Sequence, residues 1–225
     1  MSAQQIKSDF DRIALLSSSD WNHNSPFYDY LLRHVPPDCR NLLEIGCGMG
    51  QFSRRLAQRS QRVLALDLSP EMIRIARERS TGYWNIDFEL ADVMTRDFGE
   101  ERFDCIASIA TLHHLPATKI LNLSKRLLRP GGLLLVVDLV QPEGLIDNLA
   151  NLVALPLSVS NYFLHTGRLR PRREVRAAWD EHAKHDSYLT IAEVTKLCAE
   201  ILPGAAVKKH LRWRYSIVWQ KAAEG

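Results

Sequence analysis

The chain has 225 residues, of which 46% are hydrophobic and 24% charged, and this composition is typical of a soluble globular protein with one buried core. The formal net charge of +3 is too small to indicate a nucleic acid or another polyanion as the main partner. The first residues lack the basic and apolar runs of a signal peptide, and Asp147 and Pro156 interrupt the longest weakly charged stretch, so we expect no membrane span.

Residues 1–38 are expected to be mainly helical, with a helix that begins at Ser25-Pro26. Apolar runs then predict strands at Asn41–Ile45, Arg62–Asp67, Asp104–Ala110 and Leu133–Val140, and the loose alternation of Ile86–Asp92 predicts a strand there, third in chain order. Helices are expected at Gln51–Arg59 and from Ser69-Pro70 to about Arg79. The segment L-L-R-P-G-G, Leu127–Gly132, is expected to end another helix and to turn the chain into the fifth strand.

The C-terminal part is expected to close the sheet. Thr190-x-x-Glu193 is a capping box that predicts a helix, and Ala206–Leu211 and Tyr215–Gln220 predict two strands joined by a short turn. The earlier runs are continuous rather than alternating, and helices separate them, which is typical of a parallel sheet covered on both faces. We therefore expect an α/β protein with a doubly wound, Rossmann-like sheet of seven mostly parallel strands, a terminal antiparallel strand pair and a helical insertion after the fifth strand.

The strongest local signal is the run Glu44-Ile45-Gly46-Cys47-Gly48-Met49-Gly50 at the end of the first strand. Ligands of open α/β sheets bind beyond the carboxyl ends of the strands, and glycine allows the tight turn and the close backbone approach that such a site needs. The dinucleotide fingerprint G-x-G-x-x-G would require glycine where this chain has Gln51, and Glu44 would repel a pyrophosphate. S-adenosylmethionine carries a sulfonium and an ammonium group, which a nearby carboxylate attracts.

Two further carboxylates stand at strand ends. Asp67 closes the second strand, where it can accept hydrogen bonds from both ribose hydroxyls of either ligand. Asp92 closes the third, where it can accept from the exocyclic amine of an adenine, although a turn or helix-cap role is nearly as common for such an aspartate.

Together, E-x-G-x-G-x-G, the two strand-end acids and L-L-R-P-G-G resemble the class I S-adenosylmethionine-dependent methyltransferases. The segment F-D-C-I-A-S-I-A-T-L-H-H-L, Phe103–Leu115, resembles the small-molecule (type 11) branch, which includes quinone and natural-product methyltransferases. The resemblance implies that Gly46, Gly48 and Gly50 line the methionine portion of the cofactor. It implies that Asp67 holds the ribose with Leu68 and Met72 beside it, that Asp92 and Val93 meet the adenine, and that Ile109 lies near the sulfonium.

On this interpretation, residues 1–225 form a single domain. We expect a helical lid at 1–38, a cofactor-binding core at 41–140, an acceptor-side insertion at 141–189, and a closing helix with its strand pair at 190–225. Trp21–Asn24 is a candidate part of the lid, or else a surface anchor of the following helix.

His113 and His114 follow the fourth strand at the ligand edge of the sheet, and we regard them as candidate catalytic residues. A histidine there can take the acceptor's proton, because its pKa is near the working pH. Packing or capping is the alternative role, and methyl transfer to a good nucleophile needs no base when positioning and desolvation suffice.

Several acceptor classes have motifs that this chain lacks. Amino-directed nucleic-acid methyltransferases carry Asn- or Asp-Pro-Pro-aromatic where this chain has Ser108–Thr111, and Cys105 lies in an apolar run rather than in a Pro-Cys context. The glutamate pair of protein arginine methyltransferases is absent, and neither clustered acids nor cysteines at zinc-binding spacing predict a metal site. The sequence therefore favours a small-molecule acceptor and a cytoplasmic protein with reduced thiols, with no nucleic-acid partner. A nucleic-acid methyltransferase, an inactive methyltransferase-like binding module and a nicotinamide oxidoreductase are the alternatives.

Three segments of the insertion allow more than one interpretation. Trp179–Asp186, with His182 and His185 at helical spacing, is interpreted as a solvated helix face rather than as a catalytic element. The basic residues Arg168, Arg170, Arg172, Arg173 and Arg176 suit a solvated segment or, less often, an anionic acceptor. Leu145, Ile146, Leu149, Leu152 and Val153 form an apolar helical stripe that either caps a hydrophobic acceptor or completes the core. The oligomeric state is left open.

Overall fold

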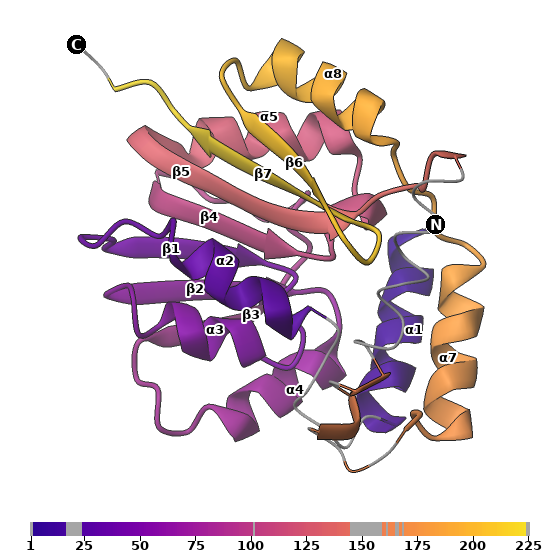
Figure 1. The fold of residues 1–225 in the computed structure, drawn as a ribbon. Coiled ribbons are helices and arrows are strands. Elements are labelled where there is room, and N and C mark those ends of the chain that lie inside the picture. Colours follow the sequence, from indigo (N-terminus) through magenta and orange to yellow (C-terminus); the bar gives the residue numbers. More distant parts are fainter. Residues whose placement is uncertain are drawn as a thin grey trace.

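A seven-stranded sheet runs through the middle of the protein, with helices on both of its faces (Figure 1). The computed structural model describes residues 2–16, 24–100, 102–144, 159–160, 162–164, 167 and 169–223. The strands are β1 (Asn41–Ile45), β2 (Arg62–Asp67), β3 (Ile86–Leu90), β4 (Phe103–Ile109), β5 (Leu128–Leu139), β6 (Ala206–His210) and β7 (Arg214–Gln220). Their order across the sheet is β3-β2-β1-β4-β5-β7-β6. The first five strands are parallel, whereas β7 is antiparallel to both β5 and β6, as the sequence predicts.

The helices are α1 (Ala3–Leu16), α2 (Tyr28–Leu32), α3 (Gln51–Leu56), α4 (Pro70–Arg79), α5 (Ala117–Leu127), α7 (Arg173–Ala183) and α8 (Ile191–Ile201). Two short 3₁₀ turns, η1 (Ser25–Phe27) and η2 (Leu112–His114), complete these elements. Alternate residues of a strand point to opposite faces, so Leu43 packs on the α5 and α8 side and Leu42 on the α2 and α3 side. Both side chains are fully buried, which explains why the apolar runs are continuous rather than alternating.

The N-terminal helix α1 packs against both α4 and α7, and it lies between them near the strand ends that the glycine loop follows (Figure 1). A small apolar cluster joins them, with Ile13 of α1, Met72 of α4 and Ala178 of α7 all buried. Residues from the beginning of the chain and from the insertion after β5 are thereby brought to one place.

Some predicted boundaries are wrong. Strand β5 begins at Leu128, because the chain from Leu128 to Gly132 forms an irregular start to the strand against Phe103 rather than a turn before it. Strand β3 ends at Leu90, two residues before Asp92. The helix start at Ser25-Pro26 is instead a 3₁₀ turn whose N-cap residue is Asn24, and α3 is shorter than predicted.

Other local predictions are confirmed. The bounds of β1 and β2 agree with the sequence, and Ser69 caps α4 by accepting a hydrogen bond from the Met72 amide. The capping box at Thr190 and Glu193 is formed on both sides. All four cysteines are buried and unpaired. No helix in the described ranges is long and apolar enough to cross a membrane.

Candidate active site

The glycine loop between β1 and α3 contains three glycines with positive φ, and packing explains two of them but not the third. A Cβ on Gly46 would lie 2.0 Å from Thr111 Oγ1, and one on Gly50 would lie 2.9 Å from the Phe88 ring, so packing excludes a side chain at either position. A Cβ on Gly48 would meet nothing within 4 Å. Gly48 therefore keeps open a space that no described residue fills.

Two carboxyl groups stand beside this loop, that of the buried Glu44 and that of the part-buried Asp67. Asp67 accepts hydrogen bonds from the Gly48 amide at 2.8 Å and from the Ser69 amide at 2.9 Å, so it orders the loop as well as facing the adjoining space. Burial raises the pKa of Asp67, against the effect of these amides. Burial also raises the pKa of Glu44 to about 7, although the Ser53 hydroxyl donates a hydrogen bond to its carboxylate. A buried carboxyl group in these surroundings favours a cationic neighbour.

A cavity of about 860 Å³ connects the loop to the rest of the site. Its wall includes every cofactor and catalytic residue predicted from the sequence except Gly50, which acts in packing the loop: Glu44, Gly46, Gly48, Asp67, Leu68, Met72, Asp92, Val93, Ile109, His113 and His114. Asp92 lies in the turn after β3, where it accepts a hydrogen bond from the Met94 amide at 2.8 Å, and Val93 is buried beside it. Sites for a single small molecule typically have volumes of about 300–1,000 Å³. This cavity can therefore hold a cofactor and an acceptor side by side only if both are small.

His113 lies at the far side of this cavity, in the 3₁₀ turn after β4, and Asp138 of β5 orients it. One Asp138 oxygen lies 2.6 Å from His113 Nδ1, and the other accepts the His113 amide at 2.8 Å. Asp138 is fully buried. This contact places a proton on Nδ1 and leaves the lone pair of the ring on Nε2.

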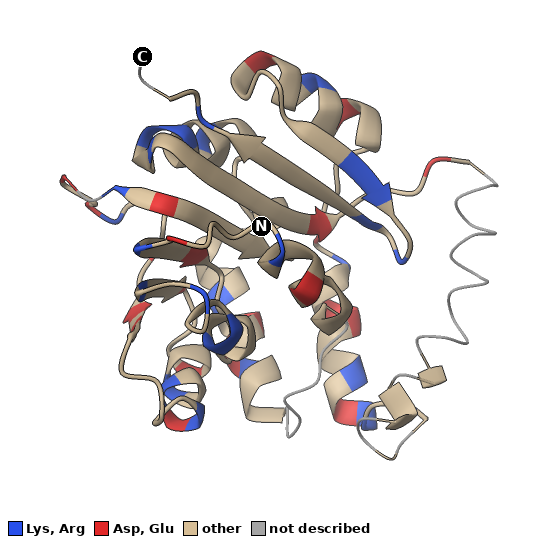
Figure 2. Ribbon diagram, turned by 60° about the vertical axis from the view of Figure 1, so that its left-hand side comes forward, with Lys and Arg blue, Asp and Glu red and all other residues tan. Residues whose placement is uncertain are grey.

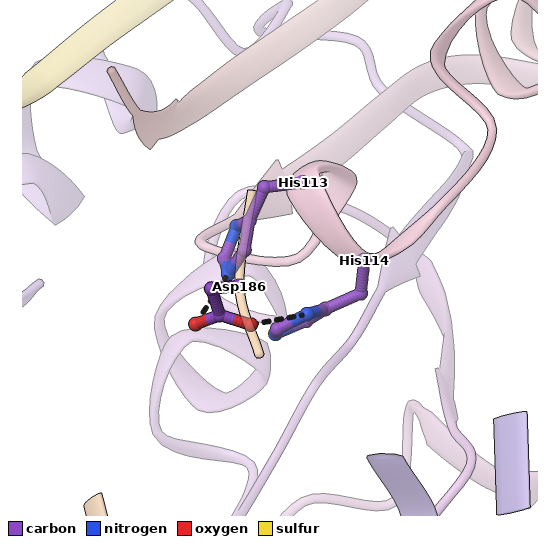
Figure 3. Close-up of side chains that lie close together, drawn as sticks. All are labelled: His113, His114 and Asp186. Atoms are coloured by element: carbon purple, nitrogen blue, oxygen red, sulfur yellow. Dashed lines mark ion pairs between the residues drawn. The ribbon is translucent and has the colours of Figure 1, made fainter. Parts of the chain in front are cut away.

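A second carboxylate, that of Asp186, lies between His113 and His114 (Figure 3). Its oxygens are 3.9 Å from His113 Nε2 and 3.4 Å from His114 Nδ1. The Tyr188 hydroxyl donates a hydrogen bond to Asp186 at 2.9 Å. Burial, together with the neighbouring His113 and His182 rings, lowers the pKa of His114 to about 2, so this ring is neutral.

His182 of α7 approaches the same group from the helical side. Its Nδ1 lies 3.0 Å from Asp9 of α1, and its Nε2 lies 3.8 Å from Asp186. The Phe10 ring packs edge-on against both His114 and His182. The interpretation of 179–186 as a solvated face is therefore wrong for His182, which α1 covers, although His185 is exposed.

Both histidines of the 3₁₀ turn are candidates from the sequence and line the cavity, whereas Asp138, Asp186 and Tyr188, which surround them, were not predicted. Asp138 had a detectable signal, because it is the only charged residue in the apolar run Leu133–Val140. Asp186 and Tyr188 had none, since their proximity to the turn depends on how α7 packs. Arg172 and Arg176 of the basic cluster are exposed and line the cavity, as does Trp179. The apolar stripe at 145–153 and the residues Trp21, Asn22 and His23 lie outside the described residues.

Comparisons with known proteins agree with this geometry. Residues 42–132 match a family model described as a methyltransferase domain. An uncharacterized methyltransferase of Mycobacterium bovis is 30% identical over 204 residues, which cover 89% of this chain and 96% of that protein. A ubiquinone biosynthesis O-methyltransferase of Xylella fastidiosa is 32% identical over 146 residues, which cover 58% of each chain.

Among solved structures, the N-methyltransferase NodS of Bradyrhizobium japonicum, in complex with S-adenosyl-L-homocysteine, has the same fold. Its TM-score is 0.62 at 17% identity, and the match covers 97% of both chains. The length and identity of the mycobacterial match establish the family, and the fold predicted from the sequence is confirmed. The chain therefore belongs to the class I S-adenosylmethionine-dependent methyltransferases, with S-adenosylmethionine as its methyl donor.

Proposed function

We propose that the protein transfers a methyl group to a small, partly hydrophobic molecule bound between the cofactor and the His113–His114 pair. The observation that carries this proposal is the continuity of the cavity, whose wall runs from Gly48 and Asp67 to both histidines. In such an arrangement the sulfonium faces the acceptor, and the methyl group passes to it by in-line displacement at carbon.

The lining of the acceptor end supports a small molecule rather than a polymer. Phe10, Leu139 and Trp179 give that end an aromatic and aliphatic wall, and Arg172 and Arg176 also line the cavity. In Figure 2, basic and acidic residues are interspersed over the described elements rather than gathered on one face. A continuous basic surface would be expected for a nucleic-acid substrate. The relative from Xylella fastidiosa, by its name, acts in ubiquinone biosynthesis, which suits a small hydrophobic acceptor here.

Within the proposed site, Gly46 and Gly48 face the methionine portion, Asp67 the ribose with Leu68 and Met72 beside it, and Asp92 and Val93 the adenine. Ile109 lies on the sulfonium side. Gly50 contributes through the shape of the loop.

His113 and His114 are proposed to act on the acceptor. Since Asp138 fixes the tautomer of His113, the Nε2 lone pair is available in the cavity. A lone pair there can take the proton of an acceptor hydroxyl or hold a cation that acidifies it. Either role removes the proton that the nucleophile must lose.

The buried Glu44 predicts a pH dependence of cofactor binding. With a pKa of about 7 in the ligand-free protein, Glu44 is neutral below pH 7, and a cationic ligand must drive its proton off. The affinity for S-adenosylmethionine should therefore rise by about tenfold between pH 6 and 7.5 and then level off. Calorimetric titrations across this range measure it, and Glu44→Gln should give a flat profile.

The raised pKa of Glu44 has the opposite effect on the stability of the ligand-free protein. Because folding raises the pKa of Glu44 from 4.5, its contribution to the free energy of unfolding falls as pH rises from about 4.5 to 7. A pH-dependent affinity that persists in Glu44→Gln would show that another group is responsible.

The acceptor class is tested with methyl-labelled S-adenosylmethionine and a cell extract separated into organic-soluble metabolites, RNA, DNA and protein. We expect enzyme-dependent label in the organic-soluble fraction. Label in RNA or protein instead would contradict the proposal, and no transfer to any fraction would favour a binding module.

A further inference from the structure

We propose that His113, His114 and Asp186 bind a divalent transition-metal ion of the Zn²⁺ type, which holds the acceptor's nucleophilic oxygen beside the methyl donor. Within the part of the chain that the structure describes, these residues each offer one ligand atom, and the three atoms lie within 4.8 Å of one another (Figure 3). In tetrahedral zinc sites with bonds of about 2.0–2.1 Å, neighbouring ligand atoms are roughly 3.3–3.5 Å apart. Asp186 Oδ1 lies 3.4 Å from His114 Nδ1, which already has that spacing, whereas the 3.9 Å contact to His113 Nε2 is made by Oδ2. Binding an ion through one Asp186 oxygen therefore requires a contraction of the three ligand atoms from their present separations of up to 4.8 Å.

Two buried atoms of the cluster have no hydrogen-bond partner among the described residues. They are Asp186 Oδ1 and His182 Nε2, in side chains that are 4% and 3% exposed. Leaving a buried carboxylate oxygen unsatisfied is costly, and native proteins rarely do so without a water, an ion or a ligand at the site. Asp186 Oδ1 is the oxygen nearest His114 Nδ1, so the unsatisfied atom faces the proposed ligand set.

The tautomers of the histidines also support a cation bound at this cluster. Asp138 holds a proton on His113 Nδ1, and Asp9 holds one on His182 Nδ1, so that both Nε2 atoms present lone pairs to the Asp186 carboxylate. Lone pairs on both sides repel unless a positive charge lies between them. A histidine whose outer nitrogen donates to a carboxylate is the usual arrangement of metal-bound histidine.

The position of the cluster indicates a catalytic ion rather than a structural one. All three ligands line the cavity that we assign to cofactor and acceptor, so a coordination position remains open toward the acceptor. The ligand set of two imidazoles and one carboxylate suits zinc and similar ions better than Mg²⁺ or Ca²⁺, which prefer oxygen ligands. His182 Nε2 lies close enough to become a further ligand on a small shift of α7.

This inference rests on the proposed function and specifies its acceptor, a molecule with an acidic hydroxyl group such as a phenol or an enol. The hydroxyl oxygen binds the ion and loses its proton to solvent water, because the ion lowers its pKa. An electron pair of that oxygen forms the bond to the methyl carbon while the carbon–sulfur bond breaks. The sulfur keeps the bonding pair, and the neutral thioether S-adenosylhomocysteine is released.

Metal binding is tested without any acceptor. Chelator-treated full-length protein is titrated with Zn²⁺ by calorimetry and with Co²⁺ by its visible absorption. We expect one ion per chain and a tetrahedral or five-coordinate Co²⁺ spectrum. His114→Ala and Asp186→Asn should weaken Zn²⁺ binding by more than about 100-fold, and Asp138→Asn by roughly 10–100-fold, as an outer hydrogen-bond partner does.

His185→Ala is the matched control, because His185 precedes Asp186 in the chain but is exposed and does not line the cavity. It should bind Zn²⁺ like the wild type. Each variant is checked for S-adenosylmethionine binding, so that a loss of metal affinity in a misfolded variant is recognised. If the wild type binds neither ion, or if His114→Ala and Asp186→Asn bind like the control, the inference is wrong.

Turnover separates this inference from the proposed function. Chelated protein should still bind S-adenosylmethionine, lose methyl transfer to the extract and regain it with Zn²⁺. Chelated protein that transfers methyl groups at the wild-type rate would overturn the metal site and leave the proposed function standing, with His113 as a free base.

Discussion

Replacing Asp138 by asparagine should lower kcat by roughly 10²–10⁴-fold, because the group that fixes the tautomer of His113 is lost. An asparagine amide placed against Nδ1 can hold the proton on Nε2, where a lone pair is needed. Among the described residues, Asp138 hydrogen-bonds to His113 and Leu139 and not to the glycine loop, so the dissociation constant for S-adenosylmethionine should stay within about twofold of wild type. Steady-state kinetics and calorimetry on the same preparation measure the two quantities.

Asp104→Asn provides the control for this variant. Asp104 also belongs to the central sheet and accepts backbone amides, those of Arg40 and Asn41, but it does not line the cavity. Both substitutions should lower the melting temperature, and only Asp138→Asn should lower kcat. If Asp138→Asn and Asp104→Asn are both folded and have equal kcat values, His113 and Asp138 take no part in the reaction.

Gly48→Val should weaken S-adenosylmethionine binding by roughly 5- to 150-fold, since overpacking a close contact costs about 1–3 kcal/mol, and a branched side chain also shifts the loop. The valine would fill the space that Gly48 leaves open beside Asp67. The substitution also carries backbone strain, because φ at Gly48 is +51°. Calorimetric titration with S-adenosylmethionine measures the change.

Gly204→Val is the control that distinguishes the effect of backbone strain from the loss of space for the cofactor. Gly204 has φ of +82° and, like Gly48, no atom within 4 Å of an added Cβ, but it lies between α8 and β6, away from the cavity. We expect both variants to lose similar stability and only Gly48→Val to lose cofactor binding. If Gly48→Val binds normally, the glycine loop does not hold the cofactor.

The sheet could be predicted because most of its parallel strands are apolar runs, and β3 alternates loosely between apolar and polar residues. Arg62–Asp67 is such a run, bounded by polar residues, and β2 has those bounds. Leu128–Gly132 could not be assigned, because Pro130 and two glycines normally mark a turn, and only pairing with Phe103 shows that the strand has already begun.

The cofactor side of the site was predictable for a similar reason. Glu44 and Asp67 lie at the carboxyl ends of β1 and β2, Gly48 follows β1, and the ends of parallel strands lie at one edge of a sheet. The acceptor side joins Asp9, His114, Asp138 and Asp186, which come from α1, the turn after β4, β5 and the segment after α7. Helical periodicity places His182 on a face of α7 but does not tell which element covers that face, so its burial required the structure.

A crystal structure with S-adenosylhomocysteine tests the central claim, that donor and histidines share one cavity. The account predicts the ribose hydroxyls at Asp67, the adenine between Asp92 and Val93, and the sulfur facing the space in front of His113 and His114. A nucleoside bound elsewhere, or a sulfur turned away from these histidines, would contradict it.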